Sequence, residues 1–279
     1  MVVRDPYTKY VLSMSYGKDS IACIEAIMQL GYPLDEIAHA EIWATDDLPA
    51  ELPEMVAWKQ EADKIIYDRY GYKVKHYYPM RNGEKLTYEK IFHEYRVNKE
   101  TGEVRYFGFP TIKLRWCAQM KKDALAAVTK IPKGRAGWYT KRIVQYLGIA
   151  ADEPSRIVRH ESKPNVVLPL VDIGWDEAYC RKWCEENNLL SPIYQNHARG
   201  GCWFCQFQPT ESLRDVRDNY PDLWKIMLEW DLESPLAFNP HGHTVHDYEK
   251  RFQMEDEGKL NPKKRFVWKD VKEERPTGL

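Results

Sequence analysis

Six consecutive residues near the start of the chain, "SYGKDS" at 15–20, combine groups that bind phosphate. They lie between an apolar stretch typical of a strand and one typical of a helix. At such a junction, the free N–H groups at the start of the helix form a binding site for an anion. The glycine lets a ligand approach the backbone, the two hydroxyls donate hydrogen bonds, and the lysine adds positive charge. The aspartate holds Mg²⁺ or a ribose hydroxyl, or caps the helix. The expected nucleotide-binding residues here are Ser15, Tyr16, Gly17, Lys18, Asp19 and Ser20. The alternative is an ordinary turn with Asp19 or Ser20 as the helix cap.

A second reactive feature is the sequence "GGCWFC", which ends with Cys202 and Cys205. A glycine-rich turn of this kind aims two thiolates at one metal, and thiolates favour iron–sulfur clusters or zinc. Cys180 and Cys184, one turn apart on a predicted helix, are either further ligands or buried packing residues. Cys23 lies on the apolar face of the first helix and is expected in the core. The alternatives for "CWFC" are a zinc knuckle that only fixes the C-terminal segment in place, and a redox-active pair of thiols.

Two other segments carry groups that suit binding. The stretch "HGHTVH" contains His241, His243 and His246, which form either a metal site or a polar turn. The stretch 130–142 concentrates basic residues around two aromatic ones, a pattern that either holds a polynucleotide or is a solvated connection. Its members are Lys130, Lys133, Arg135, Trp138, Tyr139, Lys141 and Arg142.

The elements that position these groups alternate between strand and helix. Residues 9–14, 20–30 and 36–44 read as strand, helix and strand, with Gly31 ending the helix. Further predicted elements are a helix at 53–72, strands at 72–80 and 142–150, and helices at 118–129 and 175–189, the last opened by Asp176. This alternation predicts an α/β fold with a doubly wound parallel sheet. We expect a domain over 1–205, with an insertion or flap at 82–110, followed by a mostly helical extension over 206–279.

The composition limits the classes of function. The 41 basic and 42 acidic residues nearly cancel, so a nucleic acid would be bound by a local patch. No apolar run approaches the length of a membrane span and no secretory leader is evident, so we expect a cytoplasmic protein without a membrane partner. Six cysteines in 279 residues are too few for a disulfide scaffold.

Five ordered segments resemble one family. "SYGKDS" resembles the phosphate loop of the adenine nucleotide α-hydrolase (N-type ATP pyrophosphatase) superfamily, whose sheet is of the HUP type. "ATDDLPAELPEM", "TIKLRWCAQMKKDAL", "YLGIAADEPSR" and the run from "LPLVDIGW" to "GGCWFC" resemble later segments of phosphoadenosine phosphosulfate (PAPS) reductases and of the DNA phosphorothioation sulfurtransferase. The resemblance covers about two thirds of the chain, residues 11–205.

This resemblance implies an adenine nucleotide such as ATP, with Mg²⁺, at the carboxyl edge of the sheet. Asp46 or Asp47 would recognise ribose or base, the alternative being a helix-capping pair, and Gly148 and Glu153 would line the site. Lys113, Arg115 or Arg156 would add positive charge beside the phosphates. We expect catalytic roles for Lys18, Asp19, Cys117 and Arg156.

The family fold also implies that Cys117 comes near Cys202 and Cys205. Three thiolates indicate a [4Fe–4S] cluster with one open iron, or a four-cysteine site completed by Cys180 or Cys184, with zinc as the alternative metal. The phosphate loop is then expected within reach of the metal.

The chain departs from the family at two places. Ala150 stands where the family has arginine, and Pro154 stands where it has serine, so the substrate is not carried over. No cysteine follows Cys205, whereas the reductases use a C-terminal cysteine as nucleophile.

We therefore expect ATP-dependent adenylation and sulfur transfer to an acceptor, with a nucleic acid as the leading acceptor and a sulfur-donor protein as a further partner. The alternatives are a sulfonucleotide reductase that uses external thiols, and a silent nucleotide-binding module with a structural metal.

Overall fold

The computed structural model describes residues 2–131, 133–134, 140–195, 200–261 and Trp268. The chain forms two compact units, one of residues 1–87 with 118–200 and the other of residues 88–117 with 201–279. They are called unit 1 and unit 2 below. Within the described residues, every helix is too short or too polar to span a bilayer.

Unit 1 contains a five-stranded sheet in the order β3-β2-β1-β8-β9. All neighbouring strands are parallel, which confirms the predicted α/β sheet. The strands are β1 (Thr8–Met14), β2 (Glu36–Ala40), β3 (Val74–Tyr77), β8 (Arg142–Leu147) and β9 (Val166–Val167). Because the chain reverses its direction of winding between β1 and β8, the carboxyl ends of these two strands form the edge at which such sheets bind ligands.

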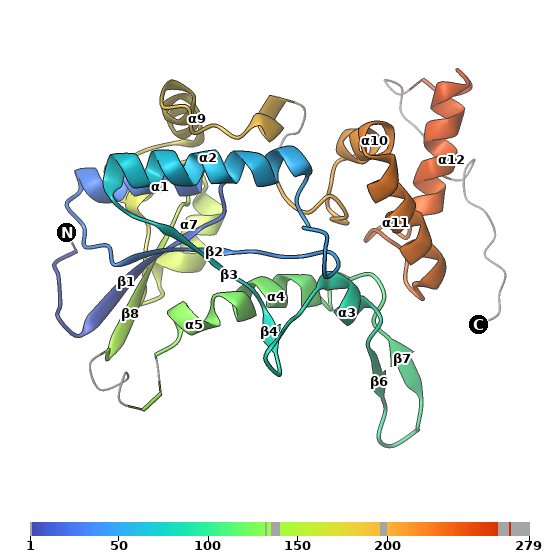
Figure 1. Ribbon diagram of the computed structural model, residues 1–279, viewed down its shortest axis with the longest axis horizontal. Helices are drawn as coiled ribbons and strands as arrows, with labels where there is room; N and C mark the ends of the chain where they lie inside the picture. Colours follow the sequence, from blue (N-terminus) through green and yellow to red (C-terminus); the bar gives the residue numbers. More distant parts are fainter. Residues whose placement is uncertain (1, 132, 135–139, 196–199, 262–267, 269–279) are drawn as a thin grey trace. The chain divides into compact units, whose positions relative to one another are not determined.

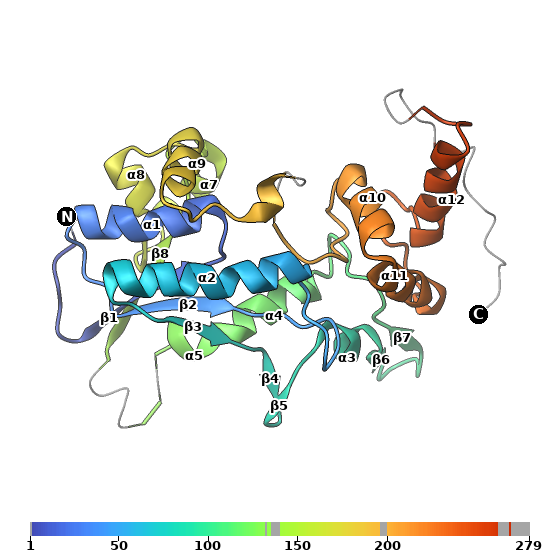
Figure 2. The ribbon, with the colours of Figure 1, turned by 45° about the horizontal axis from the view of Figure 1, so that its top comes forward.

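Helices cover both faces of this sheet (Figures 1 and 2). Helices α1 (Lys18–Gln29) and α2 (Pro53–Tyr70) lie on one face, and α4 (Trp116–Ala124) and α5 (Ala126–Thr129) on the other. The apolar face of α1 is fully buried through Ile21, Ile24 and Ile27. Gly31 follows α1 with φ of 62°, the left-handed conformation expected of a glycine that ends a helix.

Smaller helices complete unit 1. These are α7 (Pro154–Glu161), α8 (Pro169–Ile173), α9 (Glu177–Glu186) and the 3₁₀ turn η1 (Pro192–Gln195). The expected start of α9 is confirmed, because the Asp176 carboxylate accepts a hydrogen bond from the Tyr179 N–H. β2 is shorter than the predicted 36–44, because the chain turns back after Ile42 and Trp43 pairs with Pro49. A hairpin of β4 (Met80–Arg81) and β5 (Glu84–Lys85) follows β3.

Unit 2 is built around aromatic side chains. Its elements are α3 (Tyr88–Phe92), the hairpin of β6 (Tyr95–Val97) and β7 (Val104–Tyr106), α10 (Thr210–Asn219), α11 (Pro221–Glu233) and α12 (Val245–Asp256). The Tyr88 and Phe92 rings pack on Trp230, and Phe109 packs on Phe92 and Phe238.

This packing changes the expected division of the chain. We predicted a boundary at residue 205 and assigned 82–110 to the first domain as a flap. Residues 88–117 instead supply part of the unit 2 core, because Tyr88, Phe92 and Phe109 are nearly fully buried there. The helical character of the chain after residue 206 agrees with the prediction.

Candidate functional site

The loop from β1 into α1 exposes the start of a helix at the carboxyl edge of the sheet. Gly17 is the N-cap residue of α1 and has no side chain of its own to cap the helix. The first N–H groups donate to other side chains of the loop and its surroundings, that of Gly17 to Ser15 Oγ over 3.4 Å and that of Lys18 to Tyr194 Oη over 3.3 Å. The alternative reading, in which Asp19 or Ser20 caps the helix, is therefore wrong, since both lie inside the first turn. Tyr16 adopts a left-handed backbone conformation with φ of 58°. The geometry is that of an anion-binding helix start.

The serine hydroxyls hold the loop together. The Ser20 hydroxyl donates to the Gly17 carbonyl over 2.9 Å and accepts from the Ser15 N–H over 3.1 Å. The Ser15 hydroxyl lies 3.2 Å from the same oxygen. Ser20 is buried, so its first role is to shape the loop rather than to face a ligand.

Gly148, just after β8, presses directly on the start of α1. A Cβ atom there would lie 2.6 Å from Ser20 Cα and 2.7 Å from the Asp19 carbonyl oxygen, so only glycine fits. Gly17 differs, because a Cβ atom would meet only Ser15 Oγ and Tyr194 Oη, both at 3.5 Å. Space within the chain therefore does not require glycine at 17.

Three carboxylates gather beside the loop. Asp19, Glu153 and Glu177 each place an oxygen within 4.8 Å of the others. The Lys18 ammonium lies 2.9 Å from Asp19 and 3.1 Å from Glu177, so it partly neutralises the group. Burial raises the pKa of Asp19, and the charges of Glu177 and Glu153 act in the same direction while Lys18 opposes them.

Glu153 and Arg156 connect this group to α7. Glu153 accepts from the Ala150 N–H over 3.1 Å, and Arg156 donates to both of its carboxylate oxygens at 2.6 and 2.8 Å. The backbone at Ala150 therefore helps to orient Glu153, although the family arginine is missing there. Arg156 brings a positive charge to the carboxylate group, and a phosphate would have to compete with Glu153 for it.

Asp46 and Asp47 lie in the turn between β2 and α2. They do not cap α2, because its N-cap is Leu52. The Lys85 ammonium donates to the Asp46 carbonyl over 2.7 Å. Recognition of ribose or base by Asp46 or Asp47 stays a prediction, while the capping alternative is wrong.

In unit 2, Cys117, Cys202 and Cys205 all lie close enough to the buried Tyr88 phenol to act on it electrostatically. Trp116 and Phe204, which neighbour the cysteines in sequence, pack on the Tyr88 ring with centroids 4.5 and 4.2 Å away. Burial raises the pKa of the Tyr88 phenol well above its usual value, and the negative potential of the three cysteines raises it further. The turn at 202–205 is closed by a hydrogen bond of 3.1 Å from the Cys205 N–H to the Cys202 carbonyl.

Some buried polar atoms near these cysteines have no hydrogen-bond partner among the described residues. They are Tyr88 Oη, Trp116 Nε1, and Nε2 and Oε1 of Gln206. Leaving such groups unsatisfied is costly, so their gathering around three thiols fits a bound group that accepts and donates hydrogen bonds. The donor set, three sulfur atoms, suits a soft metal centre. Cys117 also lies in the first turn of α4, where the helix dipole stabilises a thiolate.

The structure does not support Cys184 as a metal ligand. Its thiol is fully buried between α1 and α9 and donates to the Lys18 carbonyl over 3.3 Å. Burial raises the pKa of both Cys184 and Cys180 to about 12, so these thiols stay protonated. Cys23 is buried in the same core, as predicted.

The other two segments predicted to bind a ligand are the histidine stretch 241–246 and the basic stretch 130–142. His246 pairs with Asp231 over 2.7 Å, while His243 stacks on Trp268 at 3.8 Å, so the histidines of "HGHTVH" have separate partners. In the basic segment, Arg135, Trp138 and Tyr139 lie outside the described residues. Arg142 belongs to β8 and donates to Asn165 over 3.1 Å.

Sequence reasoning missed a buried polar cluster in unit 1, formed by His39, Glu41 and His76. The available signal was in β2, because His39 and Glu41 alternate on one face of an otherwise apolar stretch, "IAHAEI". The partners of these residues come from α2 and β3 and are too scattered in sequence to form a motif.

No model of a known protein family matches the chain, and no curated protein matches it either. The solved structures to which the chain is similar include the PAPS reductase from Candida auris in a phosphate complex. That match has 13% identity and a TM-score of 0.38, and covers 71% of this chain and 82% of the reductase. They also include the U34-tRNA thiolase NcsA from Methanococcus maripaludis with its [4Fe-4S] cluster, at 11% identity and a TM-score of 0.37, covering 90% of this chain and 84% of the thiolase. At these identities and TM-scores, the similarities carry no information on activity.

Proposed function

We propose that the chain is an adenine-nucleotide-dependent sulfurtransferase, which activates an acceptor with ATP and uses a thiolate-held metal centre in unit 2. The observation that carries the nucleotide part is the loop 15–20, a helix start at the carboxyl edge of a parallel sheet whose N-cap residue, Gly17, has no capping side chain. A phosphate would replace the Tyr194 hydroxyl as the acceptor for the Lys18 N–H. The cysteines around Tyr88 carry the second part.

In this proposal the N–H groups at the start of α1 bind the phosphates of ATP. Cleavage between the α and β phosphates leaves an adenylated acceptor and releases pyrophosphate, so negative charge must be stabilised during the reaction. Lys18 and Arg156, which now pair with carboxylates, supply cations beside that charge.

Asp19, Glu153 and Glu177 are the residues that would hold Mg²⁺, because hard cations prefer carboxylate oxygens beside substrate phosphates. When bound, the ion would neutralise charge on the phosphates. Lys18 already offsets part of the negative charge of this group, so binding of Mg²⁺ and the position of the Lys18 ammonium would be coupled.

Cys117, Cys202 and Cys205 would hold the metal centre, which is a [4Fe–4S] cluster in the main proposal and zinc in the alternative. A cluster with one open iron would supply a binding place for sulfur. Tyr88, Trp116 and Gln206 would provide hydrogen bonds around it, since their polar atoms have no protein partner. We propose a nucleic acid as acceptor and a sulfur-donor protein as partner.

Anaerobic purification followed by iron, sulfide and zinc analysis tests the metal. Incubation with ATP, Mg²⁺ and RNA or DNA, with detection of pyrophosphate, tests adenylation. We expect about one cluster per chain and acceptor-dependent pyrophosphate release. Sulfite release from PAPS would instead indicate a sulfonucleotide reductase. Nucleotide binding without turnover on any acceptor, in a chain that holds only zinc, would indicate a silent module.

A further inference from the structure

A buried network in unit 1 lies beneath the loop 15–20, and we call it the Tyr16 network. Its members are Tyr16, His39, Glu41, Lys59, Asp63 and His76. They come from the loop itself, from β2 and the residue after it, from α2 and from β3. Only Tyr16 lies in the loop itself. The other members are not among the residues that would touch the phosphates or the metal in the proposed function.

Tyr16 ties the loop to this network through its side chain. The phenol donates to the Asp63 carboxylate and lies 3.1 Å from His76 Nε2, and the ring packs edge to face on His39 at 4.7 Å. The side chain is almost completely buried, although the backbone of Tyr16 has the left-handed φ of 58°. A non-glycine residue keeps such a conformation only where its surroundings hold it.

The residue before the loop is held by the same network. His39 Nδ1 lies 3.0 Å from the carbonyl of Met14, the last residue of β1. Burial and the charge of Lys59 lower the pKa of His39 to about 3, so the ring is neutral. Its Nδ1–H therefore donates to Met14, and its Nε2 faces the Lys59 ammonium at 3.5 Å. The network thus holds both ends of the segment Met14–Tyr16. The N–H groups of Gly17 and Lys18 follow directly, and in the ligand-free protein they donate to Ser15 Oγ over 3.4 Å and to Tyr194 Oη over 3.3 Å.

Charge within the network is nearly balanced by protein groups. Lys59 lies 3.2 Å from Glu41 and 2.5 Å from Glu51, and is itself buried. His76 lies between Glu41 at 2.5 Å and Asp63 at 3.0 Å. His39 and Glu41 already contact the Lys59 ammonium, and His76 is already paired with Glu41 and Asp63, so the atoms that would bind a metal ion have protein partners. The cluster is therefore better suited to positioning than to metal binding.

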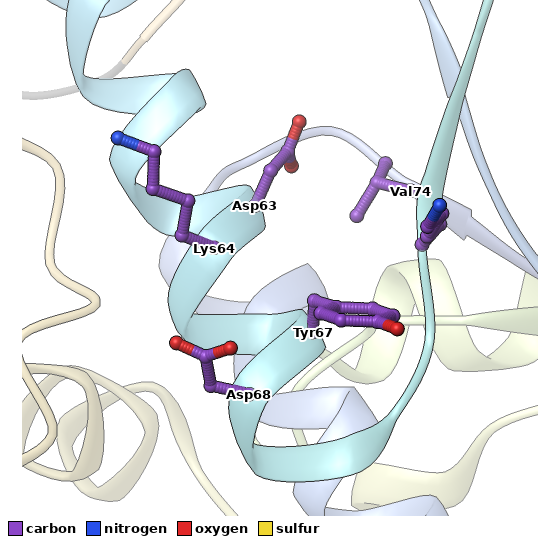
Figure 3. A pocket seen from close by; sticks show the side chains of 6 residues that line it. Asp63, Lys64, Tyr67, Asp68 and Val74 are labelled. Atoms are coloured by element: carbon purple, nitrogen blue, oxygen red, sulfur yellow. The ribbon is translucent and has the colours of Figure 1, made fainter.

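Asp63 connects the network to solvent. Its side chain also lines a surface pocket between α2 and β3, together with Lys64, Tyr67, Asp68, Lys73 and Val74 (Figure 3). The pocket contains no residue of the loop 15–20.

We propose that the Tyr16 network is a positioning device that holds the N–H groups of the nucleotide loop in their phosphate-binding arrangement. The inference rests on the proposed nucleotide binding and names Tyr16, Asp63 and His76 as positioning residues. Because they act through the loop, their loss weakens contacts to phosphate and leaves contacts to the nucleoside unchanged.

The test compares ATP with adenosine as ligands, in full-length wild type, Tyr16→Phe and Asp63→Asn. Each variant keeps the size of its side chain. Tyr16→Phe removes the hydroxyl that donates to Asp63, and Asp63→Asn replaces the charged acceptor of that hydroxyl and of His76 with a neutral, weaker one. We expect affinity for ATP to fall roughly tenfold in both, with affinity for adenosine unchanged. In the ligand-free protein, hydrogen exchange at the amides of residues 15–18 should become faster. Tyr67→Phe, on the same helix and lining the pocket of Figure 3, is the matched control.

The outcomes separate the inference from the function. If wild type binds no ATP, the proposed nucleotide binding fails and the inference with it. If wild type binds ATP and both variants bind it equally well, or lose ATP and adenosine to the same extent, the positioning role alone is overturned. Should Tyr16→Phe fail to fold, Asp63→Asn decides, because it leaves the buried aromatic ring in place.

Discussion

Replacing Gly148 with alanine tests the packing between β8 and the nucleotide loop. The new Cβ atom would lie 2.6 Å from Ser20 Cα and 2.7 Å from the Asp19 carbonyl oxygen. Both contacts are to backbone, so rotating a side chain cannot relieve them. Reaching an ordinary separation of 3.4 Å requires a movement of 3.4 − 2.6 = 0.8 Å at the start of α1.

Overpacking of this kind costs about 1–3 kcal/mol of folding free energy. That is less than the total stability of most domains, so the variant should fold. For a unit of this size, the loss corresponds to a fall in melting temperature of about 3–10 °C. Since hydrogen bonds weaken steeply when donor and acceptor shift, we also expect ATP to bind about tenfold more weakly or worse.

Thermal unfolding and ATP titration measure both effects, and two other glycines serve as controls. A Cβ atom at Gly200 meets no atom of the described residues within 4 Å, so Gly200→Ala should change neither quantity. At Gly17 the new contacts are an ordinary 3.5 Å, so Gly17→Ala should keep wild-type stability while weakening ATP binding through the ligand side alone. A Gly148→Ala variant with both the melting temperature and the ATP affinity of wild type would refute the reasoning.

Three further predictions concern charge and the metal centre. Hydrogen bonds to Asp63 and Glu41 raise the pKa of His76 to about 9. The protonated ring therefore contributes at most about 3 kcal/mol to the free energy of unfolding. This contribution is complete below about pH 6.5, the ordinary pKa of histidine, and is lost as the pH rises through about 9. Urea unfolding should show His76→Gln destabilised at pH 6 and close to wild type at pH 10, and an equal deficit at both values would contradict this. Cys202→Ser should abolish iron or zinc binding in elemental analysis, whereas Cys184→Ser should lose stability and keep the metal, and the reverse pattern would restore Cys184 as a ligand. Tyr88→Phe removes a buried hydroxyl that has no protein partner, so the metal-free protein should gain about 1 kcal/mol while the loaded protein loses metal to a chelator faster; unchanged chelation kinetics would remove Tyr88 from the centre.

Local sequence signals predicted the elements around the loop well. The periodic apolar residues of α1, the glycine after it and the Asp176 cap each act over a few residues, so their physics is visible without tertiary context. The parallel sheet followed from the alternation of such elements.

Features that depend on distant partners were not predictable in the same way. The pair Cys180 and Cys184 reads either as further ligands or, the reading that the sequence favours, as buried helix packing, and the packing of α9 against α1 decides for the core. Residues 82–110 read as a polar, aromatic and weakly periodic insertion, yet Tyr88 packs on Phe204 and Trp230, and Phe92 packs on Trp230. The Tyr16 network combines residues 16 to 76 of the chain and has no spacing that a motif could capture.

The loop 15–20 lies in unit 1 and the three cysteines in unit 2, so the expected approach of nucleotide to metal stays a prediction. This approach matters only for the sulfur-transfer step, and the proposed nucleotide site does not depend on it. The loop is therefore the part of the proposal to test first.

The most direct measurement is a crystal structure of the anaerobically prepared protein soaked with ATP. We predict that the phosphates lie within hydrogen-bond distance of the N–H groups at residues 17–20, at the start of α1. ATP bound elsewhere, or a loop without ligand at saturating ATP, would contradict the proposed function at its base.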